Sequence, residues 1–218
     1  MDKFDLADFP VIGLAGLRGA GKNYTADLLK AEIEGHSDKQ VVILSFADTM
    51  RDICKLVFGW TSEQMADRQF KEAIDPEWGV SPRHALQTLG TQWGRDLINP
   101  EIWTTVTKRR IREHIERGFL AIVDDVRFDN EAQMLVSCFD ATIIEVLPDA
   151  HSPEAMKKVP VTLLVDYLTC QSKHVSDNRL PEHLITETLT NDFTADYSTW
   201  VISYASDLIT QHPRMDAA

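Results

Sequence analysis

The sequence predicts an α/β fold, with helices on both faces of a parallel sheet. Short apolar runs alternate along the chain with segments whose apolar residues recur three or four positions apart, as on one face of a helix. The run at 11–15 passes through a glycine-rich turn into such a segment, and the run at 119–128 ends in charged residues before another. Ligands of such sheets bind at the carboxyl ends of the strands, so functional side chains are expected where these runs end.

Each element is predicted from its own local pattern. Apolar and β-branched residues cluster in the expected strands, which are 11–15, 40–47, 119–128, 141–147 and 184–191. Helical spacing is found at 23–35, 49–58, 81–98, 100–117, 129–138 and 195–211. Gly59 marks the end of the second helix, and Ser81 with Pro82 marks the start of the third. The polar or proline-rich segments 60–82 and 148–182 are expected to be loops.

Length and composition limit the classes of protein to consider. The 218 residues, 44% of them hydrophobic, suffice for one domain with a full core. No apolar run has the length of a membrane span, and the first ten residues are acidic where a signal peptide is basic and then apolar. A soluble, cytoplasmic protein is therefore expected. The three cysteines have no CxxC spacing, so reduced thiols are expected rather than disulfides or a zinc site.

The charge of the chain argues against a nucleic-acid-binding protein. A net charge of −12 gives no broad basic surface for a phosphate backbone. A small anionic ligand is still compatible with this charge, provided that it enters a local basic pocket. The candidate side chains for such a pocket are Arg51, Arg83 and Arg127.

A GxxxxGK pattern predicts a phosphate-binding loop, or P-loop, after the first strand. Gly16, Gly21 and Lys22 fit the pattern, and the strand before it and the helix after it supply the required context. Backbone N–H groups would bind phosphate oxygens, and Lys22 would add a positive charge. Asn23 stands where Ser or Thr usually reaches Mg²⁺, so either the loop has decayed or the metal is held differently. The predicted ATP-binding residues are Gly16, Gly19, Ala20, Gly21, Lys22, Asn23, Tyr24 and Thr25.

The third strand ends in a pair of aspartates and an arginine. Phosphoryl-transfer enzymes hold their metal with an Asp at such a place. Asp125 and Arg127 would point to the same side of an unbroken strand, which would place a metal-binding carboxylate beside a phosphate-binding guanidinium. The alternative is a surface ion pair at a strand end.

The helix predicted at 81–98 carries a polar stripe. Arg83, Gln87, Gly90 and Thr91 are three or four positions apart, and a glycine within a helix costs about 1 kcal/mol relative to alanine. An arginine for phosphate followed by an amide and a hydroxyl for a base edge would suit a nucleotide. An ordinary surface stripe is the equally weighted alternative.

These segments together resemble a known family. The stretches "GLRGAGKNYTAD", "LSFAD", "SPRHALQTLGT", "INPEIW", "VDDVRFDNEA" and "HVSDNRLP" are similar, in order and spacing, to those of the bacteriophage deoxynucleoside monophosphate kinases. The resemblance implies an adenylate-kinase-like P-loop NTPase fold in a single domain, 1–218. It implies a core at about 11–59, 118–147 and 183–212, a mobile NMP-binding region at about 60–117, and a lid at about 148–182.

The resemblance also implies an activity. ATP, with Mg²⁺ as cofactor, would phosphorylate a deoxynucleoside monophosphate (dNMP) to the diphosphate, in the cytoplasm of a bacterial host if the gene belongs to a phage. Neither nucleic acid nor membrane is an expected partner, and a homodimer is left open. The alternatives are another small-molecule P-loop kinase, for instance one acting on dephospho-coenzyme A or a sugar acid, and a nucleotide-binding module without turnover. Gln87 and Trp103 favour an acceptor that carries a base.

Roles for individual residues follow from the resemblance. Asp125 would bind the metal through water together with Asn23, Arg127 would hold the acceptor phosphate, and Glu131 would orient Arg127. Tyr24 replaces the usual Thr, so a hydroxyl for ATP would come from Tyr24 or Thr25. The predicted acceptor-binding residues are Arg51, Arg83, Gln87, Gly90, Thr91, Trp103, Arg127 and Glu131. Trp103 has the alternative of a core residue. The candidates for lid cations that swing onto ATP are Lys157, Lys158, Lys173 and Arg179, and the residues that match the family's HxSE segment are His174, Ser176 and Asp177.

Overall fold

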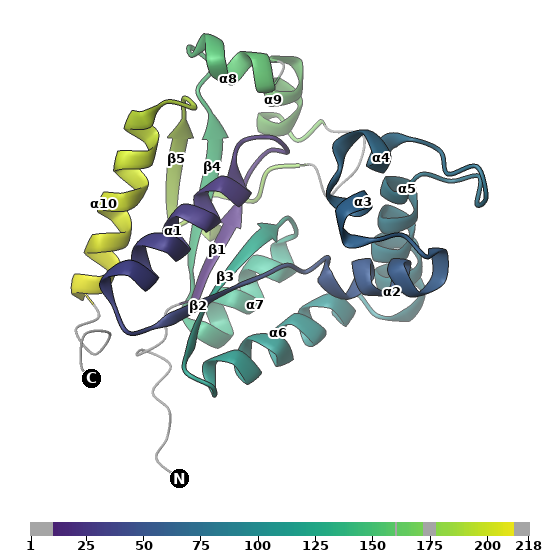
Figure 1. Ribbon diagram of the computed structural model, residues 1–218, viewed down its shortest axis with the longest axis horizontal. Helices are drawn as coiled ribbons and strands as arrows, with labels where there is room; N and C mark the ends of the chain where they lie inside the picture. The colour runs from purple at the N-terminus through teal and green to yellow at the C-terminus, as the bar shows by residue number, and fades with distance from the viewer. Residues whose placement is uncertain (1–10, 160, 172–177, 212–218) are drawn as a thin grey trace. The chain divides into compact units, whose positions relative to one another are not determined.

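The computed structural model describes residues 11–159, 161–171 and 178–211, and its centre is a parallel sheet (Figure 1). The strands stand in the order β2-β3-β1-β4-β5, and every neighbouring pair is parallel. Their bounds are β1 Val11–Ala15, β2 Gln40–Leu44, β3 Phe119–Val126, β4 Thr142–Pro148 and β5 Glu187–Asn191. The predicted α/β fold with a parallel sheet is confirmed.

The pairing of β1 with β3 contains a β-bulge. Gly13 pairs with Val123, whereas Ala15 pairs with Val126, so two steps along β1 correspond to three along β3. The extra residue therefore lies in the Asp124–Asp125 stretch. A bulge interrupts the alternation of side chains between the two faces and re-aims those that follow it.

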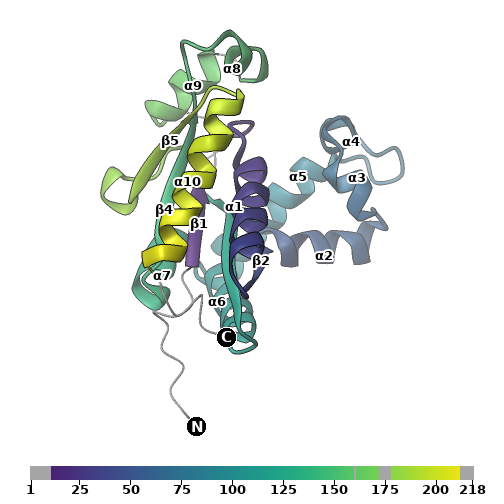
Figure 2. The ribbon, with the colours of Figure 1, turned by 60° about the vertical axis from the view of Figure 1, so that its left-hand side comes forward.

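Helices cover both faces of the sheet. α1, Lys22–His36, and α10, Ala195–Gln211, run side by side on one face (Figures 1 and 2). α7, Asp129–Phe139, packs on β1 and β4 from the other face. Apolar side chains fill the layers between the helices and the sheet, including the fully buried Leu14, Leu29, Ile122, Leu135 and Ile143.

The chain divides into two compact units. The first combines residues up to Leu44 with those from Arg110 onward and contains the whole sheet. The second, Ser45–Arg109, starts earlier than the NMP-binding region expected from residue 60. It contains the helical elements α2 Asp48–Phe58, α3 Ser62–Ala66, α4 Arg68–Glu72, α5 Pro82–Gln87 and the π-helix η2 Thr88–Ile98. The division falls within α6, Ile102–Ile115.

The second unit has its own small core. Cys54, Trp60 and Met65 are buried together, and Phe58 stacks on Trp60 with ring centroids 4.3 Å apart. α2 ends as predicted at Gly59, whose φ of 74° suits a residue without a side chain. Burial raises the pKa of the Cys54 thiol to about 11, which keeps this thiol protonated and unreactive at neutral pH.

Both segments expected to be loops contain short helices. In the first, Thr61 forms a capping box with Gln64 at the start of α3, and Asp67 caps α4. In the second, Ser152 caps α8, Pro153–Lys158, and α9, Val161–Leu168, follows. A 3₁₀ turn, η4 Glu182–Leu184, precedes β5. Caps stabilise these helices, although each is too short to show a clear helical period in the sequence.

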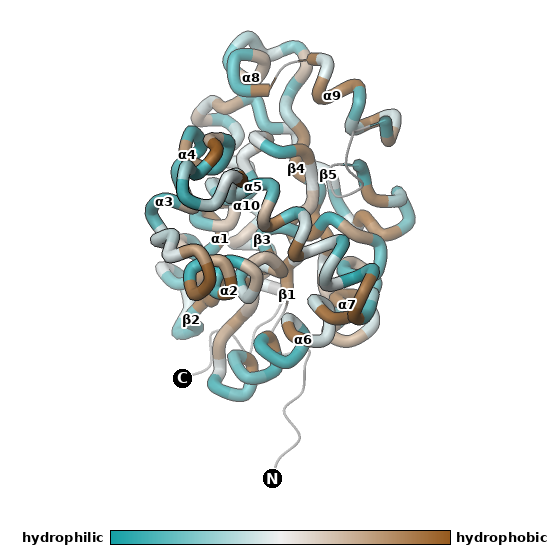
Figure 3. Tube along the Cα trace, turned by 90° about the vertical axis from the view of Figure 1, so that its right-hand side faces the viewer, coloured by the Kyte–Doolittle hydropathy of each residue, from teal (hydrophilic) through white to brown (hydrophobic). Residues whose placement is uncertain are grey.

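α9 stands out by its composition. It is apolar over most of its length (Figure 3), and it buries Leu164 and Tyr167 while Val161, Val165 and Leu168 are exposed. Among the described residues, no helix combines the length and the apolar character that crossing a membrane requires.

Candidate active site

The loop after β1 has the backbone of a phosphate-binding loop. Gly16, Gly19 and Gly21 have φ angles of 125°, 88° and 103°, which other residues rarely adopt. A Cβ on Gly16 would lie 2.1 Å from the carbonyl oxygen of Val146 on β4. A Cβ on Gly21 would lie 2.3 Å from Nδ2 of Asn191. Both the turn and its close packing against β4 and β5 therefore require glycine.

Lys22 lies over this loop. Its Nζ donates hydrogen bonds to the carbonyl oxygens of Gly16, at 2.7 Å, and Leu17, at 3.1 Å, and the residue is only 7% exposed. The ammonium is thus held at the place where α1 begins. A phosphate in the loop would meet both this charge and the N–H groups of the first turn of α1.

Asn191, at the end of β5, anchors the loop from a distant part of the chain. Its side chain is fully buried, and Nδ2 donates to the carbonyl oxygen of Ala20 at 2.8 Å. Oδ1 accepts from the backbone N–H of Phe193 at 2.8 Å. Sequence analysis missed this residue, although a lone amide closing a strand pattern is the signal that could have drawn attention to it.

An aspartate in the bulged stretch of β3 contacts the start of α1. Nδ2 of Asn23 lies 3.3 Å from Oδ2 of Asp124, the first residue of the bulged pair. The prediction that Asp125 and Arg127 share a side assumed an unbroken strand, and the bulge removes the basis for that argument. The contact of Asn23 with the strand end is therefore made with Asp124, which the sequence analysis did not single out.

These two side chains fit a magnesium ion that is shared with phosphates. Mg²⁺ in nucleotide sites is held by one or two carboxylates, substrate phosphates and water, not by a complete protein cage. The described residues contain no group of three or more His, Cys, Asp or Glu placed to hold a metal. Asp124 beside Asn23, one residue from Lys22, matches that limited set of protein ligands.

Glu131 fixes the turn that carries Arg127. The Glu131 side chain is 1% exposed, and its Oε2 accepts from the backbone N–H of Arg127 at 2.8 Å and of Phe128 at 3.1 Å. The carboxylate also stands at the N-terminus of α7, where the helix dipole favours negative charge. Glu131 therefore holds the backbone of Arg127. The resemblance had implied that Glu131 orients Arg127.

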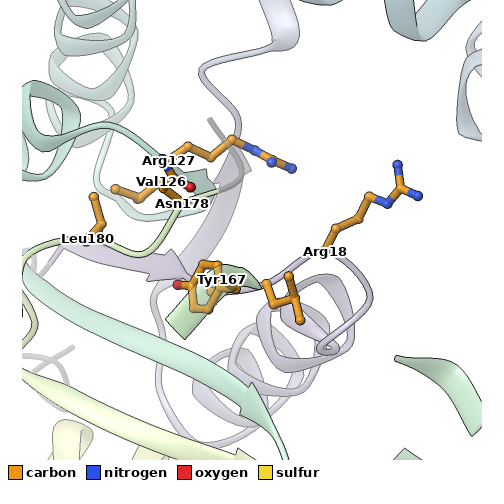
Figure 4. Close-up of a pocket in the computed structure, with 8 residues that line it drawn as sticks. Arg18, Val126, Arg127, Tyr167, Asn178 and Leu180 are labelled. Atoms are coloured by element: carbon orange, nitrogen blue, oxygen red, sulfur yellow. The ribbon is translucent and has the colours of Figure 1, made fainter. Parts of the chain in front are cut away.

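A pocket opens beside the loop. Figure 4 shows Arg18 and Arg127 at this pocket, coming from two different segments, with the hydroxyl of Tyr167 pointing away from both guanidinium groups. The lining residues are Gly16, Leu17, Arg18, Val126, Arg127, Tyr167, Asn178 and Leu180. Of the three arginines suggested as candidates for a local basic pocket, Arg127 lines this one, together with Arg18. Sequence analysis missed Arg18, although a basic residue inside the GxxxxGK pattern was the available signal.

Known proteins can now be compared with this arrangement. No protein-family model matches the chain. Over 118 residues, which are 52% of the chain, it is 30% identical to the deoxynucleoside-5'-monophosphate kinase of Escherichia phage T5. The match covers 40% of that kinase. It confirms, for half of the chain, the resemblance that the ordered stretches predicted.

A solved structure extends the comparison to nearly the whole chain. The unliganded structure of a sugar kinase from Janibacter sp. HTCC2649 has a TM-score of 0.50 and 12% sequence identity, over 96% of this chain and 99% of that one. In the chain described here, the parallel order of the strands and the glycine loop before α1 agree with the sequence pattern. The chain has a P-loop NTPase fold. At this identity the likeness concerns the fold alone.

Tyr24 and Thr25, which follow Asn23 at the start of α1, contact α10. Thr25 is fully buried, and its Oγ1 lies 2.6 Å from the hydroxyl of Tyr197 and donates to the Gly21 carbonyl at 3.0 Å. The hydroxyl of Tyr24 lies 2.8 Å from Oγ of Ser198. The contacts of both hydroxyls thus join α1 to α10, and the predicted contact of either with ATP gains no support from them.

Two predicted acceptor-binding arginines in the second unit form ion pairs there. Nη1 of Arg51 lies 2.9 Å from Oδ1 of Asp48. Nε of Arg83 lies 2.6 Å from Oε1 of Glu72. Both pairs are partly exposed to solvent, where such pairs contribute little to stability.

The predicted polar stripe is interrupted within the same unit. α5 ends at Gln87, and the chain continues as the π-helix η2, whose i→i+5 bonds change which residues share a face with Gly90 and Thr91. Gly90 is buried, and its carbonyl accepts from Nε1 of Trp103 at 2.8 Å. Trp103 is 2% exposed and packs against Gly94, as expected for the alternative of a core residue.

The lid candidates have separate environments. Lys157 pairs with Glu154, both exposed, and Nζ of Lys158 lies 4.4 Å from the ring centroid of Phe193. Arg179 pairs with the fully buried Glu145, which argues against a side chain that swings onto ATP. The other candidates lie outside the described residues, namely Lys173, His174, Ser176 and Asp177.

Proposed function

We propose that the chain is a P-loop kinase that transfers the γ-phosphate of ATP to a dNMP, giving ADP and the deoxynucleoside diphosphate. One observation carries the proposal: Lys22, the Asn23–Asp124 pair and the arginines at the pocket are all placed around one glycine loop. Similarity to the phage T5 kinase supports the choice of reaction.

ATP would bind with its phosphates in the loop after β1. The N–H groups of the loop and of the first turn of α1 are donors for phosphate oxygens, and Lys22 would exchange its loop carbonyls for them. When bound with ATP, Mg²⁺ would supply positive charge that offsets the charge of the phosphates. Asp124 and Asn23 would hold it, with Asp125 as the predicted alternative.

The acceptor would bring its own anionic nucleophile. Its phosphate needs no general base, so the protein contributes positioning and positive charge. Arg127 would hold that phosphate, and Arg18, on the other side of the pocket, would stabilise the charge that develops during transfer. The acceptor-binding roles of the residues in the second unit rest on the resemblance and are part of this proposal. They are Arg51, Arg83, Gln87, Gly90, Thr91 and Trp103.

A coupled ADP-release assay tests the proposal. Purified protein with ATP and Mg²⁺ is offered each ribo- and deoxynucleoside monophosphate, dephospho-coenzyme A and a sugar acid, with a reaction lacking acceptor as control. We expect ADP release with deoxynucleotides alone or preferentially. Release with another acceptor would assign a different small-molecule kinase, and ATP binding without release would indicate a non-catalytic module.

Kinetic signatures then test the acceptor-binding residues. Arg83→Ala should raise KM for every deoxynucleotide alike, because a phosphate contact is independent of the base. Gln87→Ala should change the preference among bases by about tenfold to a hundredfold, since a bidentate amide contact contributes about 1–3 kcal/mol of discrimination. Equal effects of Gln87→Ala on four deoxynucleotides would remove Gln87 from base recognition.

A further inference from the structure

A carboxylate that the proposed reaction does not use lies directly behind the loop. Glu145 is fully buried on β4, where it pairs in register with Ala15, the residue before Gly16. Its Oε1 accepts from Nε of Arg179 at 2.8 Å, and its Oε2 accepts from Nη2 of the same guanidinium at 2.7 Å. The hydroxyl of Tyr167 donates to Oε1 at 2.9 Å.

This carboxylate holds two parts of the pocket wall. Tyr167, near the end of α9, lines the pocket, and Figure 4 shows its ring there. Its hydroxyl donates to Glu145. Arg179 lies between Asn178 and Leu180, and both of these neighbours line the pocket. Fixing the guanidinium of Arg179 therefore restrains the backbone between two residues that line the pocket, Asn178 and Leu180.

The energetics favour a positioning role over a stabilising one. Removing two charges from water costs about as much as their attraction returns, so a buried ion pair alone is weak evidence for stability. The hydrogen bond with Glu145 raises the pKa of the Arg179 guanidinium, so the guanidinium stays charged. Burial raises the pKa of the Tyr167 phenol, so the phenol stays a donor. The contacts are directional, and their directions define the pocket wall.

We propose that Asn178 donates a hydrogen bond to a phosphate group bound in this pocket beside Arg127, and that Glu145 and Arg179 are positioning residues that hold Asn178 there. The identification of this phosphate as that of the acceptor rests on the proposed function. The amide would supply a neutral donor at a pocket that Asn178 lines together with Arg127, and Asn178 is next in sequence to Arg179, which the fully buried Glu145 holds.

A double-mutant cycle tests the proposal. The variants are Asn178→Ala, Arg179→Lys and the double variant, and Tyr167→Phe is a milder way to disturb Glu145. Glu182→Gln is the matched control, because Glu182 is exposed and contacts Arg179 from outside the pocket at 3.1 Å. Two readouts are collected for each protein: KM and kcat for each substrate, and the Kd for inorganic phosphate from ³¹P NMR titration.

Asn178→Ala should weaken phosphate binding and raise KM for the dNMP by about tenfold, because a hydrogen bond to a charged group is lost. KM for ATP should stay within about twofold of the wild-type value. Arg179→Lys should cause a smaller change in the same two quantities, since Lys keeps the charge but not the fork. The double variant should match Asn178→Ala, because a missing amide needs no positioning. Tyr167→Phe should follow Arg179→Lys, and Glu182→Gln should match wild type.

Different outcomes overturn different parts. Phosphate affinity of Asn178→Ala equal to wild type, or a wild type that binds no phosphate, removes Asn178 from the site. If the fold-changes in phosphate Kd and KM of Asn178→Ala and Arg179→Lys multiply in the double variant, Arg179 does not act by positioning Asn178. If Arg179→Lys does not fold, the cycle of Tyr167→Phe with Asn178→Ala gives the same test. Absence of turnover with every dNMP would overturn the proposed function only, and the phosphate titrations would still decide the role of Asn178.

Discussion

Asn23 and Asp124 meet at 3.3 Å, joining the first turn of α1 to the bulged end of β3. The sequence had favoured Asp125 as the metal-binding carboxylate. We expect Asp124→Asn to lower kcat by about a hundredfold and to raise the Mg²⁺ concentration for half-maximal rate, with Asp125→Asn and Asn23→Ala costing about tenfold or less. Magnesium titrations of ADP release on the three variants check this order. A larger effect of Asp125→Asn than of Asp124→Asn would instead indicate Asp125 as the metal-binding carboxylate.

Lys22 supplies the positive charge of the loop. Replacing it with Met should lower kcat by about a hundredfold or more, since transition-state charge stabilisation is lost. Lys55→Met is the control, because Lys55 forms an exposed pair with Asp52 on α2. ADP release at saturating ATP, with circular dichroism to verify folding, makes the comparison. Unchanged turnover in folded Lys22→Met would remove the loop from catalysis.

The two hydroxyl contacts between α1 and α10 should contribute unequally to the free energy of unfolding. Thr25→Val leaves the buried hydroxyl of Tyr197 without its 2.6 Å partner, and we expect the free energy of unfolding to fall by about 1–3 kcal/mol. Tyr24→Phe removes an exposed contact and should change the free energy of unfolding by less than about 0.5 kcal/mol. Urea unfolding of both variants measures the two values, and equal losses would contradict the assignment.

Stability at high pH should depend on Tyr197. Burial raises the pKa of its phenol to about 12, whereas an unfolded tyrosine titrates near about 10. The folded state then keeps a proton that the unfolded state releases, so this contribution is complete below about pH 10 and declines as pH rises toward 12. The wild type should lose its advantage over Tyr197→Phe across that window in urea unfolding. If the free energies of unfolding of the two proteins depend on pH in the same way, Tyr197 does not contribute to stability through its pKa.

Local patterns predicted the elements well where the signal is contained in a few neighbouring residues. The glycine spacing from Gly16 to Gly21 required a turn with positive φ, and the structure has one. Ser81 and Pro82 start α5, and Gly59 ends α2, as their intrinsic preferences indicate. These choices depend on steric and hydrogen-bonding preferences that a side chain has in any protein.

Features that depend on pairing with distant segments were not predictable in this way. The bulge at Asp124–Asp125 exists only in the pairing of β3 with β1, so the assumption of simple alternation along β3, on which the pairing of Asp125 with Arg127 rested, could not be checked from the sequence. The widening of the predicted helix after Gln87 into a π-helix left no mark on its apolar spacing. Asn191 and Arg179 gained their importance from partners in the loop and in β4, which no local window contains.

The anchor of the loop by β5 has a consequence for the order of events during synthesis. Ala20 and Thr25 emerge early from the ribosome, but their partners Asn191 and Tyr197 follow 171 and 172 residues later. Bringing such distant segments together is entropically costly and slow. A nascent chain that stops within β4 therefore carries the glycine loop without these supports. We expect the capacity to retain ATP to arise late, in a single step as the last strand docks.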